Sequence, residues 1–146
     1  MAITQAIANS FKKQLLEADH NFASAGGDTF KIALYTSSAT LNSATTVYAN
    51  TNEVSNTGQY VTGGGVLVNA GTSITAGVAR CSFNDRSFTG VTLTARGALM
   101  YNTSSATPNS AVAVLDFGAD KTATSGTFTI QFPAATSTAA ILRISG

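Results

Sequence analysis

Hydrophobic and polar residues alternate most regularly in the stretch 91–101. Its sequence, VTLTARGALMY, places Val, Leu, Ala, Gly, Leu and Tyr on one face, and the Thr and Arg residues on the other. A period of two is typical of a β-strand with one buried face. The polar stretch 102–110 predicts a surface loop, and residues 111–117 predict a second, antiparallel strand. This β-hairpin would place Arg96 opposite Asp116 as a cross-strand ion pair.

The remaining strands are predicted from the same alternation or from runs of β-branched and aromatic residues. They are TFKIALY at 29–35, VLVN at 66–69, VARCSF at 78–83, GTFTIQF at 126–132 and a final strand at 139–144. Three consecutive glycines at 63–65 predict a bend or bulge, because glycine is too flexible to begin a strand. The polar stretch ADKTATS at 119–125 predicts a turn.

One helix is predicted, at residues 3–18. Large apolar residues recur there at every fourth position, at Ile3, Ile7, Phe11 and Leu15. This is the spacing of one helix face, and Thr4 is placed to cap the helix start. The apolar face either packs on the sheet of its own subunit or reaches a neighbouring subunit as an anchoring arm.

A long polar segment at 36–59 predicts a loop with few large apolar residues. A loop of this length in a compact domain is usually functional or ordered by a partner. We therefore expect the helix face and this loop to make most of the contacts with other subunits or with a larger assembly. The candidate interface residues are Ile3, Ile7, Phe11, Leu15, Leu41, Val47, Tyr48 and Val54.

About seven strands and one N-terminal helix predict a mainly β protein. Antiparallel strands with one buried face favour a β-sandwich, either jelly-roll-like or immunoglobulin-like. The length of 146 residues is that of a single domain, 1–146, with the helix at 3–18 and the sandwich at 29–146.

The composition is unusual in its low charge. Charged residues make up 10% of the chain, against about 25% in an average soluble protein. So neutral a surface suits a protein that packs against copies of itself or a larger assembly, and it also suits an extracellular β domain. The formal net charge of +1 gives no electrostatic case for nucleic acid or an anionic membrane, and no apolar run approaches the ~18 residues of a membrane helix.

Few residues in the chain have the chemistry of a reactive site. The single cysteine, Cys81, excludes an intrachain disulfide and is expected to be a buried thiol. His20 follows the predicted helix, where its positive charge would be favoured by the helix dipole. The closest plausible acidic pair in the second half of the chain, Asp116 and Asp120, is better explained by loop solvation than by calcium. We therefore expect no catalytic residue, no metal site, no cofactor and no enzymatic activity.

Several segments together resemble a known group of proteins. These segments are MAITQAIANSFKKQLLEADHNF, GDTFKIALYTSSATLNSATTVY, VTLTARGALMYN and AVAVLDFGADKTATSGTFTIQFP. They span nearly the whole chain, and the chain resembles small structural proteins of tailed bacteriophages, among them head decoration or cement proteins. The resemblance implies a phage-encoded, non-enzymatic protein present in many copies on the virion. The N-terminus shows no secretory signal, which predicts synthesis in the host bacterial cytoplasm.

The leading hypothesis is a cement or decoration protein that binds the outside of a phage capsid and stabilises the shell. Its partners would be the major capsid protein and its own copies, as a homodimer or homotrimer. A tail, collar or connector component of the virion is the first alternative. A β-sandwich module that binds a host glycan or another receptor is the second, and it would need exposed aromatic residues such as Tyr48, Tyr60 and Phe88.

Overall fold

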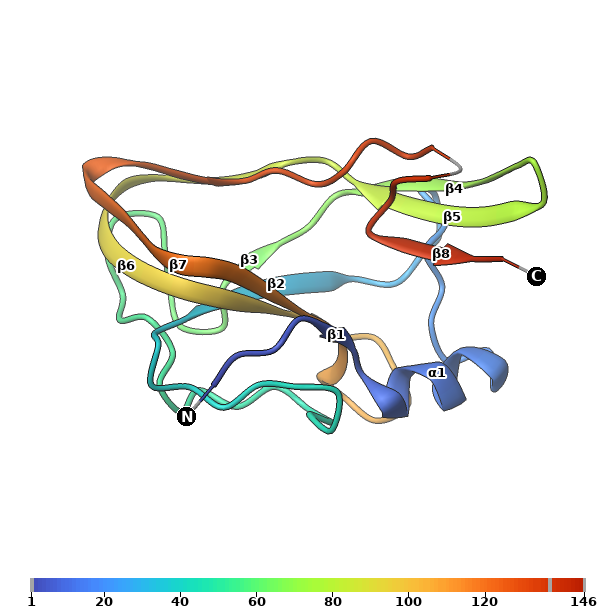
Figure 1. The fold of residues 1–146 in the computed structure, drawn as a ribbon, viewed down its shortest axis with the longest axis horizontal. Coiled ribbons are helices and arrows are strands. Elements are labelled where there is room, and N and C mark those ends of the chain that lie inside the picture. Colours follow the sequence, from blue (N-terminus) through green and yellow to red (C-terminus); the bar gives the residue numbers. More distant parts are fainter. Residues whose placement is uncertain (1, 137, 146) are drawn as a thin grey trace.

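The structure is a computed structural model that describes residues 2–136 and 138–145. In chain order its elements are β1 (Ala6–Ile7), α1 (Asn9–Leu16), β2 (Phe30–Tyr35), β3 (Gly65–Val66), β4 (Asn69–Thr75), β5 (Val78–Phe83), β6 (Arg86–Asn102), β7 (Ser110–Ile130) and β8 (Leu142–Ile144). The strands form two antiparallel sheets, of order β1-β7-β6-β2-β3 and β4-β5-β8, arranged as a sandwich of two layers (Figure 1). The predicted mainly β, antiparallel class with one helix near the N-terminus is confirmed.

Strands β6 and β7 form one long hairpin that joins the two layers. They contain 17 and 21 residues, and they curve from the lower layer around one side of the molecule into the upper layer (Figure 1). Their register shifts at several places, among them between Phe88 and Val91 and between Ala95 and Gly97. Such bulges bend a strand and increase its twist, so a single hairpin can belong to both layers.

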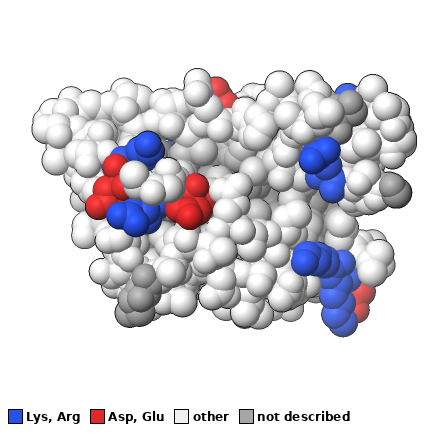
Figure 2. All heavy atoms as spheres, viewed as in Figure 1, with Lys and Arg blue, Asp and Glu red and all other residues white. Residues whose placement is uncertain are grey.

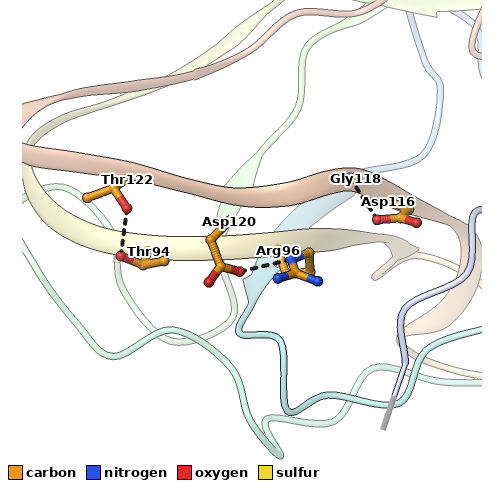
Figure 3. Close-up of polar contacts among 6 residues, drawn as sticks. All are labelled: Thr94, Arg96, Asp116, Gly118, Asp120 and Thr122. Carbon is orange, nitrogen blue, oxygen red and sulfur yellow. Dashed lines mark hydrogen bonds and ion pairs between the residues drawn. The ribbon is translucent and has the colours of Figure 1, made fainter.

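The predicted hairpin is confirmed, but the turn predicted at 119–125 is wrong. These residues continue β7 without a break. Thr94 and Thr122 are partners in the register, and their hydroxyl oxygens are 2.9 Å apart (Figure 3). Threonine is polar but β-branched, and it is therefore a good strand residue. Most side chains of the segment are exposed, so its residues are polar although it is a strand.

Arg96 pairs with Asp120 and not, as predicted, with Asp116. The Nε atom of Arg96 lies 2.8 Å from Oδ1 of Asp120, whereas Asp116 accepts a hydrogen bond from the Gly118 N–H at 2.9 Å (Figure 3). The cause is a bulge in the pairing of β6 with β7. Ala95 pairs with Lys121 and Gly97 pairs with Asp116, so β7 advances by five residues where β6 advances by two. The ion pair is partly exposed and contributes little to stability.

Strand β2 lies at the centre of the core, and both of its faces are covered. On one face Phe30 packs against Phe83 of the small sheet, with ring centroids 5.5 Å apart. On the other face the Tyr35 hydroxyl donates a hydrogen bond to the carbonyl of Ala49 in the long loop, at 2.7 Å. Because both faces are covered, five of the six residues of β2 are buried, and its sequence FKIALY has apolar residues on both faces.

The predicted helix at 3–18 is too long at both ends. Helix α1 covers Asn9–Leu16, and the chain before it is extended: Ile3 forms a parallel bridge with Leu41, and β1 pairs with β7. Thr4 does not cap the helix, because α1 begins at Asn9 and Ala8 is its N-cap; the Thr4 N–H donates instead to the Leu41 carbonyl at 2.9 Å. A spacing of four residues fits a strand face as well as a helix face, and the edge of β7 offers hydrogen bonds to an extended segment.

The bend predicted at the three glycines is confirmed. A turn at Thr62 and Gly63 precedes β3, and Gly64 has a φ of +82° directly against β2. A Cβ atom at Gly64 would lie 1.8 Å from the carbonyl oxygen of Ile32. Of the other predicted strands, 78–83 is confirmed as β5, 66–69 is divided between β3 and β4, and 139–144 shortens to β8.

Glu53 anchors the long loop 36–59 to the sheet. One of its carboxylate oxygens accepts a hydrogen bond from the Tyr48 hydroxyl at 2.5 Å. The other accepts from the Tyr60 hydroxyl at 2.6 Å and from the Gly63 N–H at 2.8 Å. Hydrogen bonds to a charged acceptor are stronger than those between neutral groups, so one side chain joins the loop to the glycine bend.

The other two tyrosines complete this cluster. The Tyr101 hydroxyl donates to the Gly63 carbonyl at 2.5 Å, its ring stacks on Tyr48 at 4.7 Å, and the Tyr35 hydroxyl donates to the loop carbonyl of Ala49 at 2.7 Å. Burial, followed by the nearby Glu53 charge, raises the pKa of Tyr101 to about 12 and raises that of Tyr35 further. The hydroxyls therefore stay protonated and remain hydrogen-bond donors.

We expect Gly64→Ala to destabilise the protein by about 3 kcal/mol or more, because it adds a clash with Ile32 to the strain of a left-handed backbone. Gly77→Ala is the matched control: its φ is +75° but a Cβ there would meet nothing within 4 Å, so it should cost about 1 kcal/mol. Urea denaturation measures both, and equal losses would contradict the close approach of the bend to β2.

We expect Glu53→Ala to lower the free energy of unfolding by about 3 kcal/mol, because Tyr48, Tyr60 and Gly63 would lose their acceptor. Glu17→Ala removes an exposed carboxylate that pairs only with Lys13 on the same helix and should cost less than about 0.5 kcal/mol. The two variants are compared by chemical denaturation. A loss at Glu53 no larger than at Glu17 would show that the cluster does not hold the loop.

Candidate docking groove

An apolar groove of about 660 Å³ lies between helix α1 and the small sheet β4-β5-β8. Its two walls come from segments far apart in the sequence. The small sheet extends past the end of the larger sheet, and α1 lies below it at the same end of the molecule (Figure 1). The groove therefore lies where the small sheet is no longer covered by the other layer.

The sheet wall consists of two cross-strand rows of residues. Cys81 of β5 pairs with Thr72 of β4 and with Leu142 of β8, and Ala79, one step further out, pairs with Ile74 and Ile144 in the same way. Within the inner row Cys81 and Leu142 are buried. In the outer row Ile74 is 71% exposed and Ile144 is 60% exposed. The apolar face of the sheet thus continues beyond the point where the core ends.

The side chains of the helix wall also become more exposed from the inner to the outer end of the groove. Phe11 is buried and closes the inner end of the groove together with Phe22. Leu15 is half-buried, and Leu16 at the end of the helix is 90% exposed. With eight residues, α1 is about 12 Å long and leaves the outer row of the sheet uncovered.

Burial also determines the chemistry of the one thiol at the bottom of the groove. Cys81 is buried, as predicted from its place in an apolar strand. Burial raises the pKa of its thiol to about 12. A thiol at neutral pH is a poor nucleophile and a poor metal ligand, so Cys81 contributes apolar surface to the groove and no reactive group.

A buried polar network fixes the helix wall. His20, just after α1, accepts a hydrogen bond at Nδ1 from the Asn102 side chain at 2.9 Å, and its Nε2 lies 2.9 Å from the Gln14 side-chain oxygen. The Asn102 amide also donates to Asp28 at 2.8 Å, and the Gln14 amide donates to the Ser110 hydroxyl at 3.3 Å. Since Asn102 and Ser110 are the two ends of the hairpin loop, this network holds α1 against β6 and β7.

His20 is not the positively charged residue at a helix end that the sequence suggested. It is buried, and its ring lies 4.8 Å from that of Phe11. Burial lowers the pKa of the imidazole below 6.5, and the carboxylates of Asp19 and Asp28 offset part of this effect. A neutral ring also fits the hydrogen bonds, because Nδ1 must be unprotonated to accept from Asn102.

The groove has basic residues at its walls. Lys12 of α1 and Arg143 of β8 are exposed residues that border it. Lys and Arg side chains are visible above and below the region between α1 and β8, at the right of Figure 2, while most of this face carries no charge. Arg80 also borders the groove, but its guanidinium is held by the Ala135 carbonyl and the Thr75 hydroxyl, each at 2.8 Å.

The structure places the predicted interface residues in several environments. Ile3, Phe11, Leu41 and Val54 are buried in the chain's own core, whereas Val47 is 41% exposed. Ile7, Leu15 and Tyr48 are half-buried and pack against this core. Three members of the set, Ile7, Phe11 and Leu15, line the groove. The loop residues of the set, Leu41, Val47, Tyr48 and Val54, do not line the groove, so the set does not form one surface. Its role in contacts with partners stays a prediction.

Three exposed groove residues were missed by the sequence analysis. Leu16 falls outside the four-residue spacing of the predicted helix face, and Ile74 is a single large apolar residue in the polar stretch GTSITAG. Ile144 was expected in the last strand without a partner strand. Only the pairing of β4 and β8 with β5 brings Ile74 and Ile144 to the same face.

Neither a metal cluster nor a membrane-spanning helix occurs among the described residues. Within 2–136 and 138–145, no three His, Cys, Asp or Glu side chains gather as a metal site would require. The same residues contain no helix that is both long and apolar enough to cross a membrane. No family model, no curated protein and no solved structure matches this chain.

We expect the stability of the protein to fall as the pH is lowered from 7 to 5, in part through His20. The imidazole pKa is lower in the folded chain than its ordinary 6.5, so in this window the unfolded chain binds more protons and acid favours unfolding. His20→Gln removes the titrating group and should flatten the pH dependence. The free energy of unfolding at several pH values tests this, and parallel curves for the two proteins would contradict it.

Proposed function

We propose that this chain is a non-enzymatic structural protein of a bacteriophage particle. It binds the outside of the capsid in many copies, as a cement or decoration protein that stabilises the shell. The observation that carries the proposal is the open groove between α1 and the small sheet, with Leu16, Ile74 and Ile144 exposed around it. The resemblance of the sequence to small virion proteins supplies the identity of the assembly.

The groove supports a role in binding another protein. Single exposed apolar residues are common on protein surfaces, but three large ones around one apolar hollow form a patch of the kind that marks an interaction site. The low charge of the chain, 10% of residues, has the same implication, since it gives little protection against association in solution.

Many copies on one particle make a modest interface sufficient. A protein that also associates with its own copies, as a homodimer or homotrimer, holds each subunit on the shell through several contacts at once. Such avidity raises the overall affinity without any increase in the contact area of one subunit. In this proposal the partners are the major capsid protein and the chain itself, and the protein is made in the host bacterial cytoplasm before it joins the virion.

Of the two alternatives, a place in the tail, collar or connector keeps the same groove and the same class of function. The glycan-binding alternative loses its support from the predicted aromatic residues. Tyr60 and Phe88 are fully buried, and the ring of Tyr48 is stacked on Tyr101. These three rings are therefore placed to pack within the protein and not against a sugar.

Antibody labelling of purified virions, viewed by electron microscopy, tests the location. We expect label spread evenly over the head. Label confined to the tail or to its junction with the head would favour the connector alternative, and the absence of label from every virion would refute a structural role.

Groove variants test the surface. Combined Leu16→Ser and Ile74→Ser should abolish most of the binding to particles that lack this protein, since about 2–3 kcal/mol of apolar contact would be lost. Both side chains are exposed, so the melting temperature should change little. Val66→Ser with Val68→Ser is the matched control, because these valines are 53% and 58% exposed and do not line the groove. Equal binding by both double variants would exclude the groove as the docking surface.

A further inference from the structure

The outermost strands of the two sheets are not equally protected against pairing with another chain. Strands β1 and β3 of the larger sheet have two residues each, and β8 of the small sheet has three, with Arg143 in the middle. Short length and charge are two of the features by which proteins keep an edge strand from pairing with a foreign strand. Strand β4, the other edge of the small sheet, has seven residues, NAGTSIT, with no charge and no proline. Its edge therefore has the length and composition of a strand that can accept another.

The turn between β4 and β5 determines which backbone groups of β4 are free. Residues 76–77 form a two-residue turn, with φ of +52° and +75°. Such a turn closes with a hydrogen-bonded pair, here Thr75 and its partner on β5. Hydrogen-bonded and non-hydrogen-bonded pairs alternate along an antiparallel ladder. Ser73 therefore also bonds to β5, whereas the N–H and C=O groups of Thr72 and Ile74 point away from β5 toward the outer edge.

The second half of β4 is open along this edge. Among the described residues, the backbone of 72–75 is hydrogen-bonded only in the ladder with β5. The loop before β2 approaches only the first half of the strand: the Asn69 side chain donates to the Ala23 carbonyl at 3.1 Å, and Ser24 lies beside Gly71. The bulge of β4 lies there too, between Asn69 and Gly71. Residues 72–75 keep a regular register, are exposed, and lead into the turn at the far right of Figure 1.

A second β4 strand has its own free groups in the arrangement that this edge requires. If two β4 strands run antiparallel with their Ser73 residues opposite each other, Thr72 of each copy lies opposite Ile74 of the other. All the outward N–H and C=O groups of these residues are then paired. The charged residue beside the edge, Arg80, lies on β5 opposite Ser73. The Arg80 residues of two copies would be three strand spacings, about 14 Å, apart, which is beyond the screening length of roughly 8–10 Å in salt.

We infer that β4 pairs with β4 of a second copy of this chain, so that the two small sheets form one continuous antiparallel sheet. The partner is specified by backbone hydrogen bonds along an uncharged edge, as in other cases of strand addition. This pairing deepens the proposed function and rests on it in one respect, since that function has the chain associate with its own copies on a particle.

The symmetry of this pairing gives the two grooves a common direction. Antiparallel pairing of the same strand requires a two-fold axis perpendicular to the sheet, and such an axis keeps each face on its own side. Thr72 and Ile74 line the groove, so both grooves open on the same side of the joined sheet and can contact one surface together. A contact of four residues per chain is far smaller than the roughly 20–30 residues a side of a standard interface. The dimer is therefore weak in solution and is favoured where two grooves bind one surface.

Cysteine variants test the register of the pairing. Residues opposite each other in a non-hydrogen-bonded pair have Cα atoms about 4.5 Å apart, within the range of a disulfide. We therefore expect Ser73→Cys to form a disulfide-linked dimer under mild oxidation. Thr75→Cys is the matched control on the same face, because two such residues would be displaced by about 13 Å along the strands. The native Cys81 is buried, with its pKa raised to about 12, and stays unreactive. Unless Ser73→Cys gives the larger amount of dimer, the pairing is refuted.

Sedimentation equilibrium measures the association without a cross-link. Ser73→Lys places two like charges directly opposite each other and should weaken the dimer by about fivefold, whereas Thr75→Lys should have little effect. Leu16→Ser changes the groove alone and should leave the association unchanged. A wild-type chain that is monomeric at about 1 mM, or equal effects of the two lysine variants, would overturn the inference. Loss of the dimer in Leu16→Ser would place the second copy in the groove and would overturn it as well.

Failure of this pairing and failure of the proposed function give different results. If Ser73→Cys cross-links but no virion carries antibody label, the proposed function fails and the pairing stands. If label covers the head while Ser73→Cys remains monomeric, the proposed function stands and the pairing is refuted. If Ser73→Lys abolishes binding to particles although the wild-type chain is monomeric, the edge of β4 accepts a strand of the shell protein, and a second copy is excluded from it.

Discussion

The pairing of β6 with β7 is the interaction on which the rest of the structure depends. In the lower layer the hairpin pairs with β2 on one edge and with β1 on the other, and in the upper layer β5 leads directly into β6. The loop of the hairpin is fastened to α1 through Ser110 and to His20, just after α1, through Asn102. The hairpin therefore fixes the positions of both walls of the groove. Because its bulges determine how strongly it bends, they also determine how far the small sheet lies from the helix.

The groove follows from a mismatch of lengths between elements that face each other. Three short strands present two rows of side chains toward an eight-residue helix, and the helix covers only the inner row. Covering the outer row would need further turns at the C-terminal end of the helix, and α1 instead ends at Leu16. The end of the helix therefore leaves Ile74 and Ile144 exposed.

The sequence predicted those features that depend on local pattern. The alternation of apolar and polar residues in 91–101 and 29–35 was sufficient to predict the central strands. The scarcity of helical periodicity was sufficient to predict the mainly β fold class. Features that depend on register were not predictable, because a bulge in β7 moved the partner of Arg96 from Asp116 to Asp120. The burial of His20 and the exposure of Ile74 depend on contacts between segments distant in the sequence, which no single stretch of residues encodes.

The cluster around Glu53 has a consequence for how the protein can be observed. The chain has four tyrosines and no tryptophan, and all four tyrosines lie at this cluster, linked to Glu53 or to the loop and bend that it joins. Near-ultraviolet absorbance and intrinsic fluorescence therefore report on one small region and give almost no signal from the groove. An optical unfolding curve of this protein follows the release of the long loop, and backbone or methyl signals are needed to follow the other end of the molecule.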